Sequence, residues 1–461
     1  MKGERGAGVR RSRMVWATVG WMAVALSGSA GAEQMDWTVH ATGQASGRME
    51  WVKDLELLSP GSSPPENPHP ALYLAASLTA KPVEAVMGRI TLGSREISRQ
   101  TLDDGHVEAR WEGNRFVDEA FVRLKDERTW LRVGKQRVVT GDGMILDDYQ
   151  PAVAAGTTWG GEASTRVRLR AVAARLDEDG ALRPGQSLHA ALTVELVPSL
   201  FRRVWVSVAR LWDRDGLIDR VMPQAVILAR RDLLFDPEGG HVTWWVAGGE
   251  ALVRGWTVRG LGIVQRGGLD VIGRDATGLG LPQTRSIRVE GLAGSFRASY
   301  AVTDPLTVGG FALYTSGDGR RPIEVWQEER YEGFLGIFPL IDTTSLFFRG
   351  GISQSFETGR TATSGVDGRG VAALGTEGKW ERSGFSSRVV VAHLWSEHPP
   401  TTGDGRNYGW EVDTEAAYRA APWATVWVEG DLLVPGSFFQ DQTSPPAETV
   451  TKAVVGLDVS F

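Results

Sequence analysis

Apolar and polar residues alternate with a period of two along most of this chain, and that pattern restricts it to β-strands. The last segment shows the pattern most plainly. One face carries Thr449, Thr451, Ala453, Val455, Leu457, Val459 and Phe461, and the other carries Lys452, Val454, Gly456, Asp458 and Ser460. A strand of a soluble β-sandwich alternates in the same way, so one segment decides little. The number of such segments decides between a β-sandwich and a β-barrel.

Eighteen segments of this kind follow one another along the sequence. Tight turns and longer polar loops alternate between them, as in a barrel with turns at one end and loops at the other. We therefore predict an all-β fold: a transmembrane antiparallel up-and-down β-barrel of 18 strands, with short periplasmic turns, longer extracellular loops and both chain ends on the periplasmic side. The predicted strands are residues 35–52, 71–81, 83–97, 115–127, 129–141, 152–162, 166–176, 187–198, 201–213, 241–253, 254–267, 286–302, 305–316, 369–381, 384–397, 407–419, 422–434 and 448–461.

Two segments fit this prediction poorly. Residues 152–162 make a weak strand by composition. Residues 345–356 alternate fairly well but are left out, because an odd strand count would move long loops to the wrong side. We assign 317–366 to one long outer loop. Its apolar run, Phe334 to Ile341, either dips into the pore mouth or rests on the barrel rim, and we expect the rim contact.

The first 32 residues have the pattern of a secretory signal peptide. Basic residues precede an apolar stretch from Met14 to Leu26, and the small-residue site Ala30-Gly31-Ala32 follows. The apolar stretch is too short to cross a bilayer as a helix, although a retained N-terminal anchor is the alternative. We expect a signal peptide at 1–32, a barrel at 33–461, and export to the outer membrane of a Gram-negative cell.

Composition argues against several classes of function. The formal net charge is −6, and it becomes −10 once residues 1–32, with five basic residues and one acidic residue, are removed; this argues against a nucleic-acid partner. The chain has no cysteine, and its seven histidines show no metal-type or catalytic spacing. We predict no catalytic residue, no metal, no cofactor and no enzyme. A hydrolase site assembled from distant strands is the alternative.

Charged residues that repeat with period two are expected to face the lumen, because an arginine on the lipid face costs roughly 2–4 kcal/mol near the bilayer midplane. The basic candidates come from two segments. They are Arg123 and Lys125, which share a face with Glu119, and Arg166, Arg168 and Arg170. In the alternative interpretation, the second set lies at the periplasmic interface, where its side chains reach water or headgroups.

The segment 130–138 cannot be oriented from its alternation alone. Lys135 and Arg137 share a face with Leu131 and Val133, while Arg132 and Gln136 share the other face. Both faces therefore combine charged and uncharged residues.

The later strands contribute negative charge. The acidic candidates are Glu411, Asp413 and Glu415 in one segment, and Glu429 with Asp431 in the next. If the barrel closes as predicted, a basic wall and an acidic wall would create a transverse field that biases which solutes pass. Alternatively, most of these groups are simply hydrated in a wide pore.

The segments 117–124 and 131–137 resemble the paired strands of alginate-export-type outer-membrane porins. In that family an acidic-aromatic strand precedes a Gly-Arg-Gln-Arg signature, which here reads Gly134-Lys135-Gln136-Arg137. The resemblance implies a monomeric barrel whose positive constriction passes an anionic polysaccharide outward. It also implies that Lys135 and Arg137 face the lumen, with Arg175 beside them if a bulge intervenes.

The sequence departs from that family at two places. Only a tight turn around Ala420 and Pro422 joins two late strands where alginate exporters have a long periplasmic turn, and the 97–114 loop is short for a lid. A general or small-anion pore is therefore at least as well supported as an alginate exporter. We predict a channel for small or oligomeric anionic, sugar-acid-like solutes; the alternative is a plugged or scaffold barrel that binds an envelope partner without conduction. The expected partners are outer-membrane lipid and lipopolysaccharide, an anionic solute or polysaccharide, and the barrel-assembly machinery through the strand that ends at Phe461.

Overall fold

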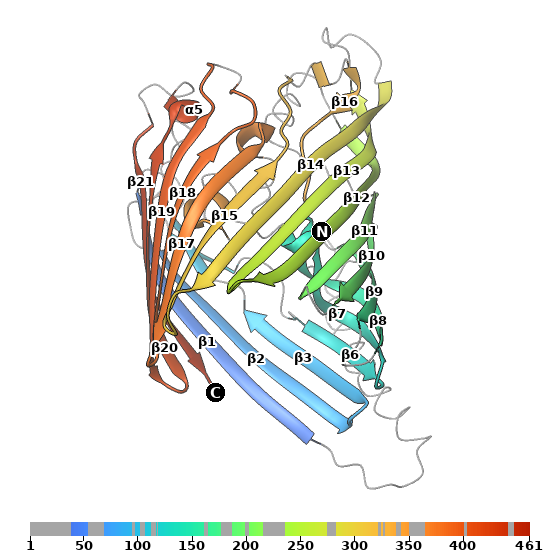
Figure 1. The fold of residues 1–461 in the computed structure, drawn as a ribbon, viewed down its shortest axis with the longest axis vertical. Coiled ribbons are helices and arrows are strands. Elements are labelled where there is room, and N and C mark those ends of the chain that lie inside the picture. Colours follow the sequence, from blue (N-terminus) through green and yellow to red (C-terminus); the bar gives the residue numbers. More distant parts are fainter. Residues whose placement is uncertain are drawn as a thin grey trace, which may run out of the picture.

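A single antiparallel sheet closes on itself in the computed structural model of the protein (Figure 1). The structure describes residues 38–53, 69–94, 97–101, 107–111, 117, 119–160, 165–176, 187–198, 202–214, 236–273, 283–320, 324–325, 328–337, 343–349, 365–400, 403–440 and 447–461. The predicted signal peptide at 1–32 lies outside these residues.

Eighteen strands form the barrel wall, as the alternation predicts. Each predicted segment contains most of one wall strand. They are β1 (Thr38–Lys53), β2 (His69–Val83), β3 (Val86–Ser94), β6 (Glu119–Lys125), β7 (Thr129–Thr140), β8 (Leu146–Trp159), β9 (Arg166–Arg175), β10 (Leu188–Val197), β11 (Arg203–Asp213), β12 (Asp236–Val253), β13 (Trp256–Gly273), β14 (Gln283–Ala301), β15 (Leu306–Thr315), β17 (Val371–Arg382), β18 (Phe385–Trp395), β19 (Asn407–Ala421), β20 (Ala424–Pro435) and β21 (Val450–Ser460).

The first and last strands close the barrel. β21 pairs antiparallel with β1 from Gln44–Ser460 to Lys53–Thr451. Beyond this ladder the Phe461 amide donates to the Gly43 carbonyl oxygen (3.0 Å), and the Gly43 amide donates to the Phe461 carbonyl oxygen (2.6 Å). The Phe461 ring lies where a side chain at position 43 would be. Glycine at 43 therefore lets the terminal ring pack against the first strand.

Three further short strands lie outside the wall. β4 (Ile97–Thr101) and β5 (Val107–Trp111) form a separate hairpin in the 97–114 loop. β16 (Arg330–Tyr331) pairs in parallel with β14. It belongs to the long loop predicted at 317–366, so it leaves the barrel count unchanged.

The weak segment 152–162 does form a strand, β8, which begins at Leu146. Its inward positions include Ala152, Ala154 and Gly156, and small side chains there leave space for groups that pack inside the barrel. Residues 345–349 of the rejected segment form a short helix, η2 (Ser345–Arg349), rather than a strand. Both outcomes agree with the parity argument.

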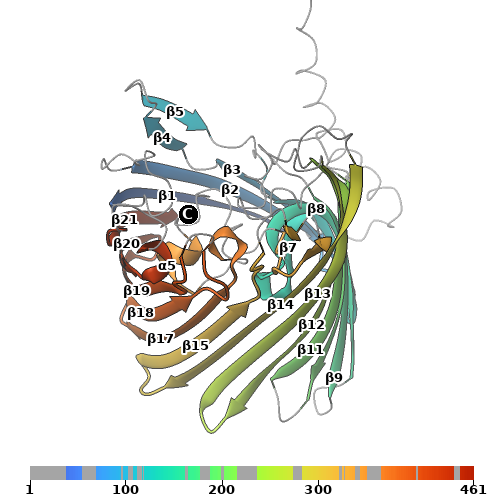
Figure 2. The same ribbon diagram turned by 90° about the horizontal axis from the view of Figure 1, so that it is seen from above.

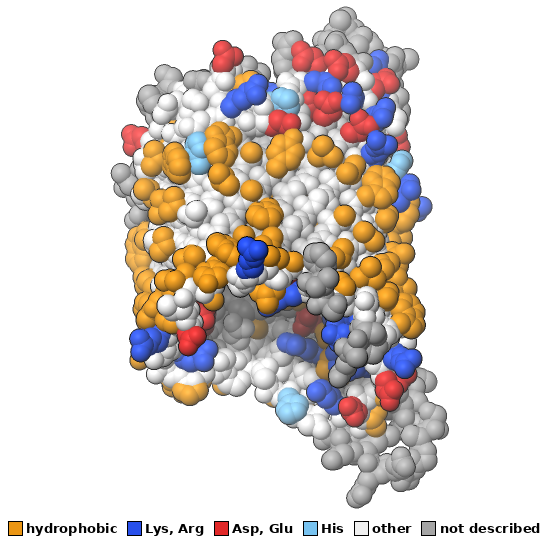
Figure 3. All heavy atoms as spheres, in the orientation of Figure 1, with side chains coloured by type: hydrophobic (Ala, Val, Ile, Leu, Met, Phe, Trp, Pro, Cys, Tyr) orange, Lys and Arg blue, Asp and Glu red, His pale blue; other side chains and the backbone are white. Residues whose placement is uncertain are grey.

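The outer surface carries the apolar band that a lipid-facing wall requires. Exposed side chains such as Val206, Leu192, Trp245 and Leu374 alternate with inward ones along their strands. Figure 3 shows this band between charged residues at the two ends, and the barrel is hollowed at the short-turn end. No described helix is long and apolar enough to cross a membrane.

Two loops enter the barrel and build an apolar core inside it (Figure 2). Between β7 and β8, the turn η1 (Gly141–Gly143) places Ile145 in this core. In the long loop, Phe334 (0% exposed), Leu335 (2%) and Ile337 (2%) are buried. The predicted rim contact of this run is therefore wrong for residues 334–337; residues 338–341 lie outside the described residues.

Backbone hydrogen bonds explain why the run lies inside. The Leu335 amide donates to Gln265 Oε1 (2.9 Å), and Trp244 Nε1 donates to the Leu335 carbonyl oxygen (3.0 Å). The Ile337 amide donates to the Ile145 carbonyl oxygen (2.7 Å), which joins the two loops. These inward-facing partners satisfy peptide groups that would otherwise be buried without hydrogen bonds.

Candidate functional site

The inner face of β6, β7 and β9 forms a basic wall. On β6 the phase predicted from the sequence is observed: Leu124 is exposed outside, while Glu119, Phe121 and Arg123 share the other face. Lys125 continues this face at the turn end and is exposed. The ladder between β6 and β7 pairs Arg123 with Arg132, so two guanidinium groups lie side by side on the wall.

Arg132 is a wall residue that sequence reasoning did not select. Its strand could not be oriented from alternation, but the structure buries Gln136 (2% exposed) and Val138 (1%) in the same phase. The Arg132 guanidinium lies 4.6 Å from the centre of the Phe121 ring. The sequence contains one signal for this orientation. Arg132 shares its face with Trp130 and Gln136, whose polar groups often form hydrogen bonds inside a protein.

β9 supplies the second row of the basic wall. Arg166, Arg168 and Arg170 have the same phase as the buried Val172 and Ala174, so the predicted inward orientation holds without a bulge. Arg168 Nη1 lies 3.2 Å from Glu195 Oε1 on β10.

A second ion pair on this wall joins Arg89 on β3 to Glu119, with 3.2 Å between Nε and Oε2. Within the described residues, the Nε atoms of Arg123 and Arg132 are buried and have no hydrogen-bond partner. The two carboxylates therefore balance only part of the positive charge of this wall.

Three predicted wall residues, Lys135, Arg137 and Arg175, lie on the outer face instead. Lys135 and Arg137 alternate with the buried Gln136 and Val138, and the register between β7 and β8 is continuous. Arg137 Nε donates to Asp147 Oδ1 (2.6 Å) on that outer face. Arg175 is likewise outside, because no bulge reverses the phase of β9. The lumen placement implied by the family resemblance is wrong for these residues.

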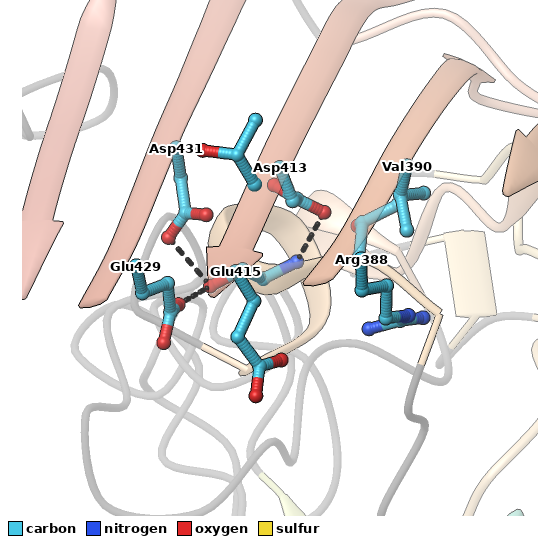
Figure 4. Close-up of a pocket in the computed structure, with 9 residues that line it drawn as sticks. Arg388, Val390, Asp413, Glu415, Glu429 and Asp431 are labelled. Atoms are coloured by element: carbon cyan, nitrogen blue, oxygen red, sulfur yellow. Dashed lines mark hydrogen bonds between the residues drawn. The ribbon is translucent and has the colours of Figure 1, made fainter. Parts of the chain in front are cut away.

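An acidic wall faces the lumen from β19 and β20 (Figure 4). Glu411, Asp413, Glu429 and Asp431 alternate with exposed residues such as Trp410 and Val428, which confirms their predicted phase. Their environment differs from the prediction, because Glu411 is completely buried and Asp413 and Asp431 are nearly so. The group that covers them is η2 of the long loop.

Carboxylate oxygens accept the hydrogen bonds of η2. The Ser345 amide donates to Asp413 Oδ2 (2.9 Å), and the Leu346 and Phe347 amides both donate to Glu411. Ser345 Oγ donates to Asp431 Oδ2 (2.7 Å) and also contacts Glu429. These hydrogen bonds satisfy amides that would otherwise be buried without a partner. The acidic wall therefore holds the loop.

Lys452 balances part of this negative charge. Lys452 Nζ on β21 lies 2.8 Å from Glu429 Oε1 and 3.3 Å from Asp431 Oδ2, and it donates to Ser345 Oγ (3.0 Å). Arg388 on β18 lines a pocket together with Asp413, Glu429 and Asp431, and its own ion pair is with Glu377 on β17 (3.4 Å). Glu415 is the exception among the predicted acidic residues: it is exposed and points away from the Ser345 contacts in Figure 4.

Aromatic residues hold the far side of η2. The rings of Phe347 and Tyr408 have centroids 5.0 Å apart, and Tyr408 contacts Phe438 of α5 (Ser437–Gln440) at 4.5 Å. The Tyr408 hydroxyl donates to the Gly370 carbonyl oxygen (2.9 Å). The loop is thus fastened at both its polar and its apolar side.

At the outer rim, ion pairs connect the loop to β14. Arg330 Nη2 lies 2.9 Å from Glu290 Oε2, and Arg320 contacts both Glu328 and Glu332. Burial acts to lower the pKa of Arg320, but its hydrogen bonds to these glutamates outweigh burial and raise that pKa. Burial raises the pKa of Tyr331, so its hydroxyl stays neutral beside Asp318.

Metal binding has no support in this part of the molecule. Among the residues that the structure describes, no group of three or more His, Asp or Glu side chains is arranged to hold an ion. The carboxylates of the acidic wall instead face backbone amides, Ser345 and Lys452.

Known proteins resemble this chain in structure. No protein-family model matches the sequence, and no curated protein matches it. The solved structure of Pseudomonas aeruginosa OpdO is similar with a TM-score of 0.51 and 11% identity, over 92% of this chain and 97% of that one. P. aeruginosa OccK9 (OpdG) gives 0.50 and 13%, over 92% and 98%. These likenesses establish the fold, and the alginate-export-type resemblance is not confirmed.

Proposed function

We propose that the protein is an outer-membrane channel through which small anionic solutes diffuse. The observation that carries the proposal is the basic wall: Arg123, Arg132 and Arg170 face the lumen together with Arg168. A one-sided excess of positive charge at a constriction attracts anions and repels cations. The guanidinium forks suit carboxylates, which agrees with a sugar-acid-like solute.

The fold supports the location. The closed barrel, the apolar outer band and the short turns at one end fit an outer-membrane protein, and the structural neighbours are outer-membrane porins. We propose a monomer, exported with removal of residues 1–32 and inserted by the barrel-assembly machinery through the strand that ends at Phe461. Small anions are favoured over a polysaccharide, because two loops occupy part of the lumen.

The inserted loops also favour a second candidate: a plugged barrel that serves as an envelope binding partner. The buried Phe334 and Phe347 are the observation behind it. Recordings from single refolded barrels in planar bilayers separate the two. The channel predicts discrete conductance steps and a reversal potential of anionic sign under a salt gradient. Absence of steps from folded protein would leave the plugged barrel, and cation selectivity would contradict the anionic solute.

A uronate monomer and a longer uronate oligomer test the solute class. A monomer that enters the basic wall is expected to interrupt the current briefly and repeatedly. Neutral glucose is the matched control and is expected to leave the current unchanged. Equal interruption by glucose would show that the size of a solute, rather than its charge, determines whether it enters the channel.

A further inference from the structure

Ser345 of η2 lies among three ionisable side chains of the barrel wall. Its Oγ is 2.5 Å from Glu429 Oε1, 2.7 Å from Asp431 Oδ2 and 3.0 Å from Lys452 Nζ. Dashed lines in Figure 4 show the two acids converging on this hydroxyl. Ser345 is 6% exposed and Asp431 is 4% exposed. One buried hydroxyl therefore joins the long loop to two acids and an amine.

These contacts need one proton more than the hydroxyl and the amine supply. A hydroxyl donates one hydrogen and accepts through two lone pairs. Lys452 donates to one lone pair, and the hydroxyl donates to one of the two acids at a time. The other acid, also within hydrogen-bond distance of Ser345 Oγ, bonds to it only by donating a proton of its own. The docked arrangement, in which η2 contacts the acidic wall, is therefore complete when Glu429 and Asp431 together hold one proton.

The charges at this contact agree with one protonated acid. Lys452 Nζ lies 2.8 Å from Glu429 Oε1 and 3.3 Å from Asp431 Oδ2, and in the described part of the chain no second basic side chain pairs with either acid. Two ionised acids would leave a buried negative charge without a counter-ion, which is strongly unfavourable. Asp431 Oδ1 is also buried with no hydrogen-bond partner among the described residues, and a bare oxygen costs less in a neutral carboxyl group than in a carboxylate.

Neighbouring elements do not supply the missing positive charge. Arg388 on β18 pairs with Glu377 on β17 (3.4 Å), and Lys379 lies 3.6 Å from the same glutamate. The short helix α5, which packs behind η2 through Tyr408, has no titratable side chain. The acids of β19 add negative charge rather than balance it; they are Glu411, Asp413 and Glu415.

Release of η2 would change the protonation of this pair. Exposed Glu415 lines the same pocket as Glu429 and Asp431, so water from the lumen reaches the edge of the contact. Once η2 leaves, both acids face that water, where a carboxyl group ionises at about pH 4. The released state therefore holds no proton on this pair at neutral pH, whereas the docked state holds one.

We infer that η2 docks on the acidic wall with uptake of one proton, so that acid holds the long loop in the lumen and alkali releases it. Because the docked state binds the additional proton, the ratio of docked to released loop falls by about tenfold for each pH unit above about pH 5. This fall continues until the docked state itself loses the proton. In the proposed channel the lumen would be narrower in acid and wider in alkali. That widening rests on the proposed function, but the docking does not.

A spin label on the loop measures docking without any current. The chain has no cysteine, so Thr343→Cys provides one attachment point, two residues before Ser345. The refolded barrel is held in neutral detergent at the urea concentration that makes half of the labels mobile at pH 7. Because each pH unit changes the ratio about tenfold, we expect a docked-to-released ratio of about 10:1 at pH 6 and about 1:10 at pH 8. The same ratio at both pH values would overturn the inference.

Asp431→Asn tests whether the proton belongs to this pair. Lys452 lies closer to Glu429, so a neutral group is best placed at position 431, where the amide N–H can donate to Ser345 Oγ at every pH. At its own urea midpoint the variant is expected to keep a ratio of about 1:1 from pH 6 to pH 8. Glu415→Gln, which removes an exposed acid of the same pocket, is the matched control and should keep the full pH dependence. Full dependence in Asp431→Asn, or its loss in Glu415→Gln, would assign the proton elsewhere and contradict the inference.

Single-channel conductance in the same urea concentration tests the consequence for the pore. It is expected to be severalfold larger at pH 8 than at pH 6 in the unmodified protein, and constant in Asp431→Asn. A label that titrates in a barrel that carries no current would contradict the proposed channel and leave the proton-linked docking supported. A conductance that changes with pH while the label does not would contradict the docking and leave the channel supported.

Discussion

The basic and acidic walls of the lumen arise from the same sequence pattern but occupy different environments. On β6, β7 and β9 the arginines line the lumen, and the ion pairs Arg89–Glu119 and Arg168–Glu195 offset only part of their charge. On β19 and β20 the carboxylates are buried beneath η2 and accept its backbone hydrogen bonds. Phase along a strand thus determines which face a charge occupies. Whether that charge meets solute or protein depends on the loops.

The two walls therefore have different roles. A wall with unbalanced positive charge can select solutes, whereas a wall whose carboxyl groups already accept hydrogen bonds can set the width of the pore by holding a loop in place. Four variants test this division, and they follow in order of decreasing expected effect.

Glu411→Ala with Asp413→Ala is expected to change the channel most. The two carboxyl groups accept hydrogen bonds from the amides of Ser345, Leu346 and Phe347, and leaving a buried amide without its acceptor costs about 1–3 kcal/mol. Their loss shifts the docked loop toward release by about 100-fold or more. Single-channel conductance is expected to rise severalfold. Glu415→Ala, on the same strand and face, is the control and should not change it; a rise there too would show that charge rather than loop docking controls the pore.

Lys452→Met is expected to lower the free energy of unfolding by about 3 kcal/mol, because it leaves Glu429 and Asp431 buried without their cation. Denaturant unfolding of the refolded barrel measures this. Lys379→Met removes a more exposed lysine that lies 3.6 Å from Glu377, and it should cost about 1 kcal/mol or less. Equal losses would mean that the acidic wall is no more buried than the rest of the lumen.

Arg132→Gln with Arg170→Gln is expected to lower the ratio of anion to cation permeability. One charge near a passing ion contributes about 1 kcal/mol in water, or about fivefold for each arginine. Reversal potentials under a salt gradient measure the ratio. Lys135→Gln with Arg137→Gln, on the outer face of the same strand as Arg132, is the matched control. A lower permeability ratio in the control pair, with none in the Arg132 and Arg170 variant, would show that Lys135 and Arg137 face the lumen.

Arg137→Gln alone should have the smallest effect. Its ion pair with Asp147 lies on the outer face with the guanidinium about half exposed, so unfolding is expected to change by 1 kcal/mol or less. Conductance and selectivity should stay constant. A change in either would indicate that the Arg137 side chain faces the solute path.

Several features of the fold could be predicted directly from the sequence. The strand count, the alternation of turns and loops, the closing strand and the phases of Arg123, Arg168, Glu411 and Glu429 all follow from residue order. A strand turns successive side chains to opposite faces, so its pattern is local and needs no knowledge of its partners. The same local rule failed on β7, where each face combines charged and uncharged residues.

Only the tertiary structure decided the orientation of β7 and the destination of the long loop. Lys135 and Arg137 lie outside because the pairing of β7 with β6 and β8 buries Gln136 and Val138. The loop lies inside because Leu335 meets Trp244 and Gln265, and Ser345 meets Asp413 and Asp431, across 68 to 91 residues of sequence. Contacts between such distant residues form only when the barrel closes, so no local periodicity records them.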